Sequence, residues 1–144
     1  MKGAAGCVAG ALLLFGCAGG EAPAAPPSWS GPPRLYSLPA YQSPVRGEAD
    51  DLLLLPGYGF DPGDTVVYAA LHDTTTPLNP PDAIPAASTA DAGVAQVVAA
   101  ADAPYALTVR LPGSLRQGQS YGLWVRSPQQ QWSNGIRIND ARPL

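Results

Sequence analysis

The sequence predicts an all-β domain of about seven short strands, arranged as a sandwich or a barrel. Prolines and glycines, 17 and 16 among 144 residues, interrupt the chain too often for long helices. Charged residues make up only 13% of the chain, a balance that favours strands and turns over amphipathic helices. Apolar and polar residues alternate along 105–111 and 121–125, which is the period of a strand with one buried face.

The strands are expected where β-prone runs lie between turn residues. In chain order these runs are 34–38, 51–55, 65–71, 94–98, 105–111, 121–125 and 136–138. The unbroken leucines at 52–55 predict burial on both faces, or a strand that enters beneath a loop. Glycine, proline and aspartate between 57 and 64 predict a turn. The proline-rich segment 72–92 predicts a long loop without regular structure.

The N-terminus has the pattern of an export signal. Lys2 is followed by an apolar run too short to span a bilayer, and this run ends in Leu14-Phe15-Gly16-Cys17. The tetrad resembles the lipobox of bacterial lipoproteins. The resemblance implies that residues 1–16 are a signal peptide that is removed, and that Cys17 is acylated and anchors the protein to a membrane. Without acylation of Cys17, the expectation is an ordinary secreted protein.

A linker and one domain are expected after the signal. Residues 17–33 are rich in alanine, glycine, proline and serine, a composition typical of a disordered linker. Its one large apolar residue, Trp29, is either mobile or docked on the domain or at the membrane interface. The segment 34–142 is long enough for a single domain. With Cys7 in the signal and Cys17 in the anchor, no cysteine remains for a disulfide, so an apolar core must hold the domain together.

The charge pattern argues against a nucleic-acid partner. The formal net charge is −3, and the arginines are scattered along the chain. Proteins that bind nucleic acid through its phosphates need clustered cations. We therefore expect no nucleic-acid partner.

Several short motifs resemble the IPT/TIG type of immunoglobulin-like domain. They are Gly57-Tyr58-Gly59-Phe60, Leu107-Thr108-Val109-Arg110-Leu111-Pro112, Tyr121-Gly122-Leu123-Trp124-Val125-Arg126, and Trp132-Ser133-Asn134 before Ile136-Arg137-Ile138-Asn139. The resemblance covers about residues 45–140 and implies an immunoglobulin-like β-sandwich. The long proline-rich loop departs from the compact family pattern. Similar modules precede right-handed β-helix proteins that act on polysaccharides, and on this resemblance the catalytic part lies outside these 144 residues.

One candidate binding surface follows from the alternation of the last two strands. If Tyr121, Leu123, Val125, Ile136 and Ile138 point inward, the residues between them share the outer face of adjacent strands. These outer residues are Trp124, Arg126 and Arg137. Such a surface could stack on a sugar ring or a protein side chain. The alternative is that the 72–92 loop or the arginine side chains cover Trp124.

Other polar residues point to structural roles. His72 is the single histidine and lies at the start of the proline-rich segment 72–92, so a hydrolytic triad is not expected. One group of carboxylates is interpreted either as a calcium site or as turn caps, and it comprises Asp61, Asp64 and Asp73. A second group is interpreted either as a glycosidase pair or as solvated charges at the rim of the domain, and it comprises Glu48, Asp50 and Asp51. We expect no catalytic residue, metal or cofactor.

Together these features predict a non-catalytic, lipid-anchored module of the cell envelope that binds a protein or glycan partner. Ala18 after the cysteine resembles the pattern of lipoproteins sorted to the outer membrane, which would place the protein there or at the cell surface. The alternative is an accessory or remnant N-terminal module of a β-helix enzyme that processes polysaccharides.

Overall fold

The computed structural model describes residues 30–36, 46–73, 75 and 77–139. The signal peptide, Cys17 and most of the linker, including Trp29, lie outside the described residues. The described part is built from strands. They are β2 (Arg34–Leu35), β3 (Leu52–Tyr58), β4 (Thr65–Ala70), β5 (Ala92–Ala99), β6 (Ala106–Arg110), β7 (Tyr121–Arg126) and β8 (Ile136–Ile138). Among these residues no helix is long and apolar enough to cross a bilayer.

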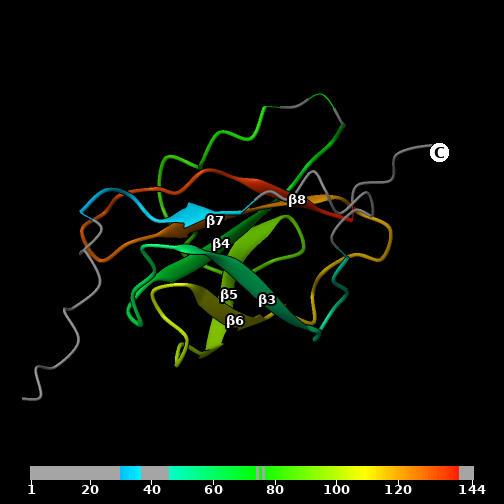
Figure 1. Cartoon of the computed structure of the whole chain (residues 1–144). Coiled ribbons are helices and arrows are strands. Elements are labelled where there is room, and N and C mark those ends of the chain that lie inside the picture. The colour runs from blue at the N-terminus through cyan, green and yellow to red at the C-terminus, as the bar shows by residue number, and fades with distance from the viewer. Residues whose placement is uncertain (1–29, 37–45, 74, 76, 140–144) are drawn as a thin grey trace, which may run out of the picture.

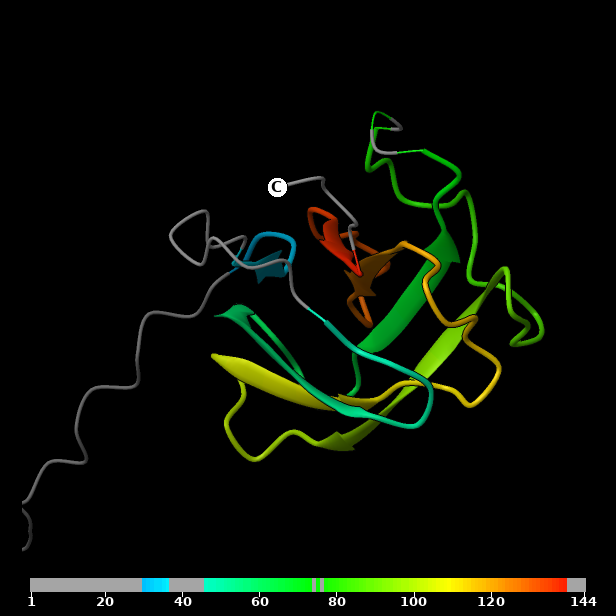
Figure 2. The same ribbon diagram turned by 90° about the vertical axis from the view of Figure 1, so that its right-hand side faces the viewer.

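The strands form an antiparallel, strongly curved sheet in the order β2-β3-β6-β5-β4-β7-β8 (Figure 1). β5 belongs to both halves of this sheet, because Ala92–Ala95 pair with β4 and Gln96–Ala99 pair with β6. The register of β5 shifts between Val97 and Ala99, a bulge of the kind that bends a strand. Figure 2 shows the result, with β3 and β6 facing β7 and β8 across the interior. The all-β prediction is confirmed, and the sheet is barrel-like and nearly closed.

The core lies between these two halves of the sheet. Its fully buried members include Leu55, Leu107, Val109 and Leu123, which alternate with outward residues as the two-residue period predicts. The expectation of burial on both faces of the leucine run is wrong. Leu53 and Leu55 are buried, whereas Leu52 and Leu54 are 57% and 58% exposed. The strand has one buried face because nothing among the described residues covers its outer side.

Two buried tyrosines tie the 72–92 loop to the core. The rings of Tyr68 and Tyr121 meet edge to face, with centroids 5.9 Å apart and planes at 75°. The Tyr68 hydroxyl donates to the Thr89 carbonyl at 2.6 Å, and the Tyr121 hydroxyl donates to the Ala90 carbonyl at 2.8 Å. The end of the loop is therefore held by core side chains, because buried hydroxyls require partners.

Two asparagine side chains fasten the N-terminal part of the domain to the ends of β8. The Asn134 amide accepts from the Leu35 N–H and donates to the Leu35 carbonyl, both at 2.9 Å. The Asn139 amide does the same for Gly47, at 3.0 and 2.6 Å. Each amide presents an acceptor and a donor side by side, as a neighbouring strand would. These two contacts, the asparagine clamps, bridge the remaining gap in the barrel.

Candidate functional site

Trp124 is buried and does not form an exposed stacking surface. Its side chain is 2% exposed, and its indole Nε1–H donates to the Leu78 carbonyl at 3.3 Å. Gly122 and Gly135 make room for the ring, since a Cβ at either position would collide with it. Alternation places Trp124 on the outer side of β7, but the 72–92 loop runs along that side and covers it (Figure 1). The expectation of an exposed Trp124 is wrong, and the covered alternative is correct.

The two arginines of the expected surface have separate surroundings. Arg137 lies opposite Gly122 in the β7–β8 ladder and is partly exposed. Arg126 ends β7, opposite Thr65 of β4, and its guanidinium carbon lies 5.0 Å from the centre of the Trp132 ring. The aromatic partner of Arg126 is thus Trp132 rather than Trp124. Its Nη2 also approaches the Gln130 Oε1 at 3.5 Å.

Arg126 borders a shallow groove of about 360 Å³ on the surface. The groove, called the Arg126 groove below, is formed where β4 starts, β7 ends and the 72–92 loop passes. Its lining residues are Gly63, Thr65, Ile84, Arg126, Ser127, Pro128 and Gln130. Its volume is at the lower end of the range of small-ligand sites. The sequence signal for Arg126 was its outward position, whereas Ile84 and Thr65 join it only through the fold.

The turn after β7 holds one wall of the Arg126 groove in place. Ser127 N–H donates to the Gln131 carbonyl at 2.9 Å, and Gln130 N–H donates to the Ser127 carbonyl at 2.8 Å. The Ser127 hydroxyl accepts from the Gln131 N–H at 3.1 Å. Arg126 and Trp132 form an isolated antiparallel bridge at the base of the turn. Because several hydrogen bonds connect the two sides of this turn, the backbone that carries Arg126 and Gln130 is held in one conformation.

The carboxylates considered for calcium cap turns. Asp64 Oδ2 accepts from the Asp61 N–H at 2.9 Å, Asp61 Oδ1 accepts from the Gly63 N–H at 2.8 Å, and Asp73 Oδ1 accepts from the Thr75 N–H at 2.8 Å. Within the described ranges, no three metal-ligating side chains come together. The turn-cap interpretation therefore agrees with the contacts.

Asp64 is a buried carboxylate in the turn before β4. Its side chain is only 6% exposed, and its Oδ1 has no hydrogen-bond partner in the part of the chain that the structure describes. Burial raises the pKa of Asp64 from 3.8 to about 6, although the hydrogen bond from the Asp61 backbone acts in the opposite direction.

The carboxylates considered as a glycosidase pair lie on the exposed turn before β3. Asp51 Oδ2 accepts from the Glu48 N–H at 2.9 Å, and Glu48, Asp50 and Asp51 are all exposed. Asp50 has φ near 68°, a conformation that aspartate tolerates in turns. His72 is exposed at the start of its loop. These positions favour the rim-charge interpretation, because no carboxylate of this group borders the Arg126 groove.

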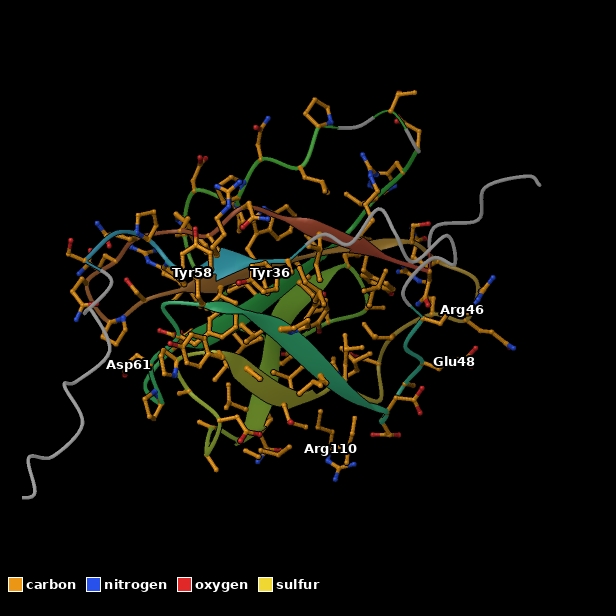
Figure 3. The ribbon with its side chains drawn as sticks, viewed as in Figure 1. Tyr36, Arg46, Glu48, Tyr58, Asp61 and Arg110 are labelled. Carbon is orange, nitrogen blue, oxygen red and sulfur yellow. The ribbon has the colours of Figure 1, made fainter. Side chains whose placement is uncertain are left out.

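A second surface feature, which the sequence analysis missed, is an apolar sheet face. Leu52 lies opposite Arg110 and Leu54 lies opposite Thr108, so these side chains share the outer side of β3 and β6. Val98, in the bulge of β5, is 40% exposed beside them. We call these five residues the leucine face. Figure 3 shows Arg110 pointing away from the barrel, whereas Tyr36 and Tyr58 lie together at the β2–β3 end.

The leucine face could have been found from the same alternation that located the other strands. In Leu52-Leu53-Leu54-Leu55 every second residue must point outward if only one side is covered. The identical residues concealed this alternation.

Comparisons with protein-family models, curated proteins and solved structures found no match for this chain.

Proposed function

We propose that this protein is a non-catalytic module of the cell envelope that binds a protein partner through the leucine face. The observation that carries the proposal is the exposure of Leu52 and Leu54, at 57% and 58%, on one regular sheet surface. Scattered exposed leucines are ordinary, but leucines that adjoin on a rigid surface are typical of interaction sites. Full burial of an exposed leucine contributes about 1.5–3 kcal/mol, so burying the part of each leucine that is still exposed would contribute about 1–2 kcal/mol.

The chemistry of the leucine face favours a protein over a glycan. Branched aliphatic side chains pack against other aliphatic or aromatic side chains, whereas sugar recognition depends on hydroxyl and amide groups and flat rings. Arg110 lies beside Leu52, and its Nη1 donates to the Asp50 carbonyl at 3.1 Å. The partner surface that suits this face is apolar, with an acidic group near Arg110.

Photocrosslinking in cells that produce the full chain tests this proposal. A photoreactive phenylalanine analogue replaces Leu54, and in a control it replaces Gln117, an exposed turn residue. We expect a discrete protein adduct from position 54 that disappears when Leu52 is also changed to Asp, and no matching adduct from position 117. Equal labelling at both positions, or none at position 54, would refute a protein interface at the leucine face.

Membrane attachment and family membership belong to the same proposal. We propose acylation of Cys17 and an outer-membrane or cell-surface location, supported by the lipobox-like tetrad and the linker-like composition of 17–33. Mass spectrometry of the purified protein tests the anchor, and an unmodified Cys17 retained in a soluble product would contradict it.

We further propose an IPT/TIG-type immunoglobulin-like domain, and its support is that the Tyr121–Arg126 motif forms β7 and the Ile136–Ile138 motif forms β8.

A second candidate function is glycan binding as an accessory module of a polysaccharide-processing enzyme. The specific observation in its favour is the Arg126 groove, which combines an arginine, an amide, a hydroxyl and small apolar surfaces. These are groups that sugar sites use.

A further inference from the structure

We propose that the Arg126 groove is a binding site for acidic saccharides, with Arg126 as the residue that receives a sugar carboxylate. This inference rests on the second candidate function and is independent of the leucine face. It names a ligand class, a carboxylate-bearing sugar, from the charge and lining of the groove.

The first argument is the state of the Arg126 guanidinium. Its central carbon lies 5.0 Å from the centre of the Trp132 ring, and its hydrogen bond from Nη2 to the Gln130 Oε1 is long, at 3.5 Å. Among the described residues no carboxylate lies within ion-pair distance of Arg126, whereas Arg116 pairs with Asp91 at 2.8 Å. A guanidinium carries several N–H donors in one plane and suits two parallel bonds to a carboxylate. Stacking on Trp132 limits the motion of that plane, so fewer rotamers are lost on binding.

The second argument is the lining of the groove around Arg126. Thr65 supplies a hydroxyl and Gln130 a side-chain amide, both able to bond sugar hydroxyls. Ile84, 39% exposed, and Pro128 supply apolar surface for the carbon face of a sugar ring. The residues that line the groove include one cation and no acidic residue, and the neighbouring Asp61 carboxylate accepts from the Gly63 N–H at 2.8 Å. An acidic sugar therefore suits it better than a neutral or basic one.

The shape of the groove favours a saccharide over an acidic peptide. The groove is open and shallow, and its lining lacks a deep apolar pocket for a peptide side chain. A peptide gains most of its affinity from such anchors or from pairing with a strand edge. A short run of sugar rings needs only a surface along which polar and flat apolar groups alternate.

Nuclear magnetic resonance titration of the purified full chain tests the inference. The probes are trigalacturonate and a glucuronate oligosaccharide, with galactotriose as the neutral match and hexaglutamate as the acidic peptide. We expect the acidic sugars to shift the Trp132 indole and Gln130 amide signals, and galactotriose to bind at least tenfold more weakly. Arg126→Gln is expected to weaken acidic-sugar binding at least tenfold, whereas Arg116→Gln, which removes the same charge from outside the groove lining, is expected to leave binding unchanged.

Two further variants keep the test decisive if Arg126→Gln folds poorly. Arg126→Lys retains the charge but loses the planar contact with Trp132, and is expected to bind with intermediate affinity. Ile84→Glu places a negative charge on a wall of the groove and is expected to weaken acidic-sugar binding at least tenfold, and its melting temperature is measured beside its affinity because Ile84 is only 39% exposed.

Three results would overturn the inference. They are no binding of either acidic sugar, acidic-sugar binding that the Arg126 and Ile84 variants leave unchanged, and hexaglutamate binding as strong as sugar binding with the same dependence on Arg126. If the acidic sugars do not bind but position 54 gives a crosslink, the protein-binding proposal stands and the acidic-sugar site is wrong. If the acidic sugars bind but position 54 gives no crosslink, the acidic-sugar site stands and the protein-binding proposal is wrong.

Discussion

Replacing Asn134 by Ala should weaken the domain well beyond the usual effect of a surface substitution. The Asn134 amide makes two hydrogen bonds to Leu35, each 2.9 Å long, and these hold β2 beside the start of β8. A typical hydrogen bond contributes about 1 kcal/mol to stability, so losing both costs about 2 kcal/mol. For a domain of this size, each kcal/mol lowers the melting temperature by about 4–8 °C. The expected decrease is therefore about 8–16 °C.

Thermal unfolding followed by circular dichroism measures this decrease, and hydrogen exchange locates it. The Leu35 amide should lose protection in the Asn134→Ala variant, because its acceptor is the Asn134 side chain. Gln131→Ala is the matched control, since Gln131 is exposed in the same hairpin. If Asn134→Ala melted no lower than this control, or if Leu35 exchange were unchanged, the clamp would not stabilise the barrel.

Two other substitutions separate structural from functional roles. Trp124→Ala should cost about 3–5 kcal/mol of unfolding free energy in chemical denaturation, because the buried ring leaves a cavity beneath Leu78; a stable variant would contradict the burial of Trp124. Asp64→Asn should stabilise the protein at pH 7 by at most about 3 kcal/mol, because the ionised carboxylate, with its pKa raised from 3.8 to about 6, opposes folding above pH 6. Protonation of Asp64 relieves this cost as the pH falls from about 6 to 3.8. Chemical denaturation of both proteins should therefore show a more stable Asp64→Asn variant at pH 7 and almost no difference at pH 4. A stability difference that is the same at both pH values would argue against the raised pKa of Asp64.

Much of the strand assignment could be predicted because the two-residue period is a local property. The segment 105–111 contains β6, 121–125 lies within β7, and 136–138 coincides with β8. The first strand is shorter than predicted, since β2 comprises only Arg34–Leu35. β3 runs on to Tyr58, past the start of the predicted turn, because Gly57 N–H donates to the Tyr105 carbonyl at 3.0 Å. Hydrogen bonds to distant segments, rather than local propensity, decided these ends.

The candidate sites could be predicted only in part, because a site depends on what covers a surface. Outward positions were correctly expected for Trp124 and Arg126, and the structure keeps both on the outer side of β7. The groove at Arg126 also needs Ile84 from the loop and Thr65 from β4, which no local pattern connects.

Local periodicity alone thus established an all-β chain and the inward or outward direction of most strand residues, since side chains alternate along any strand. The fold decided which outward residues meet solvent. Trp124 is covered by Leu78, 46 positions earlier, whereas Leu52 and Leu54 stay exposed. The path of an irregular loop is set by distant contacts such as those of Tyr68 and Tyr121, and such contacts leave no periodic trace in the sequence.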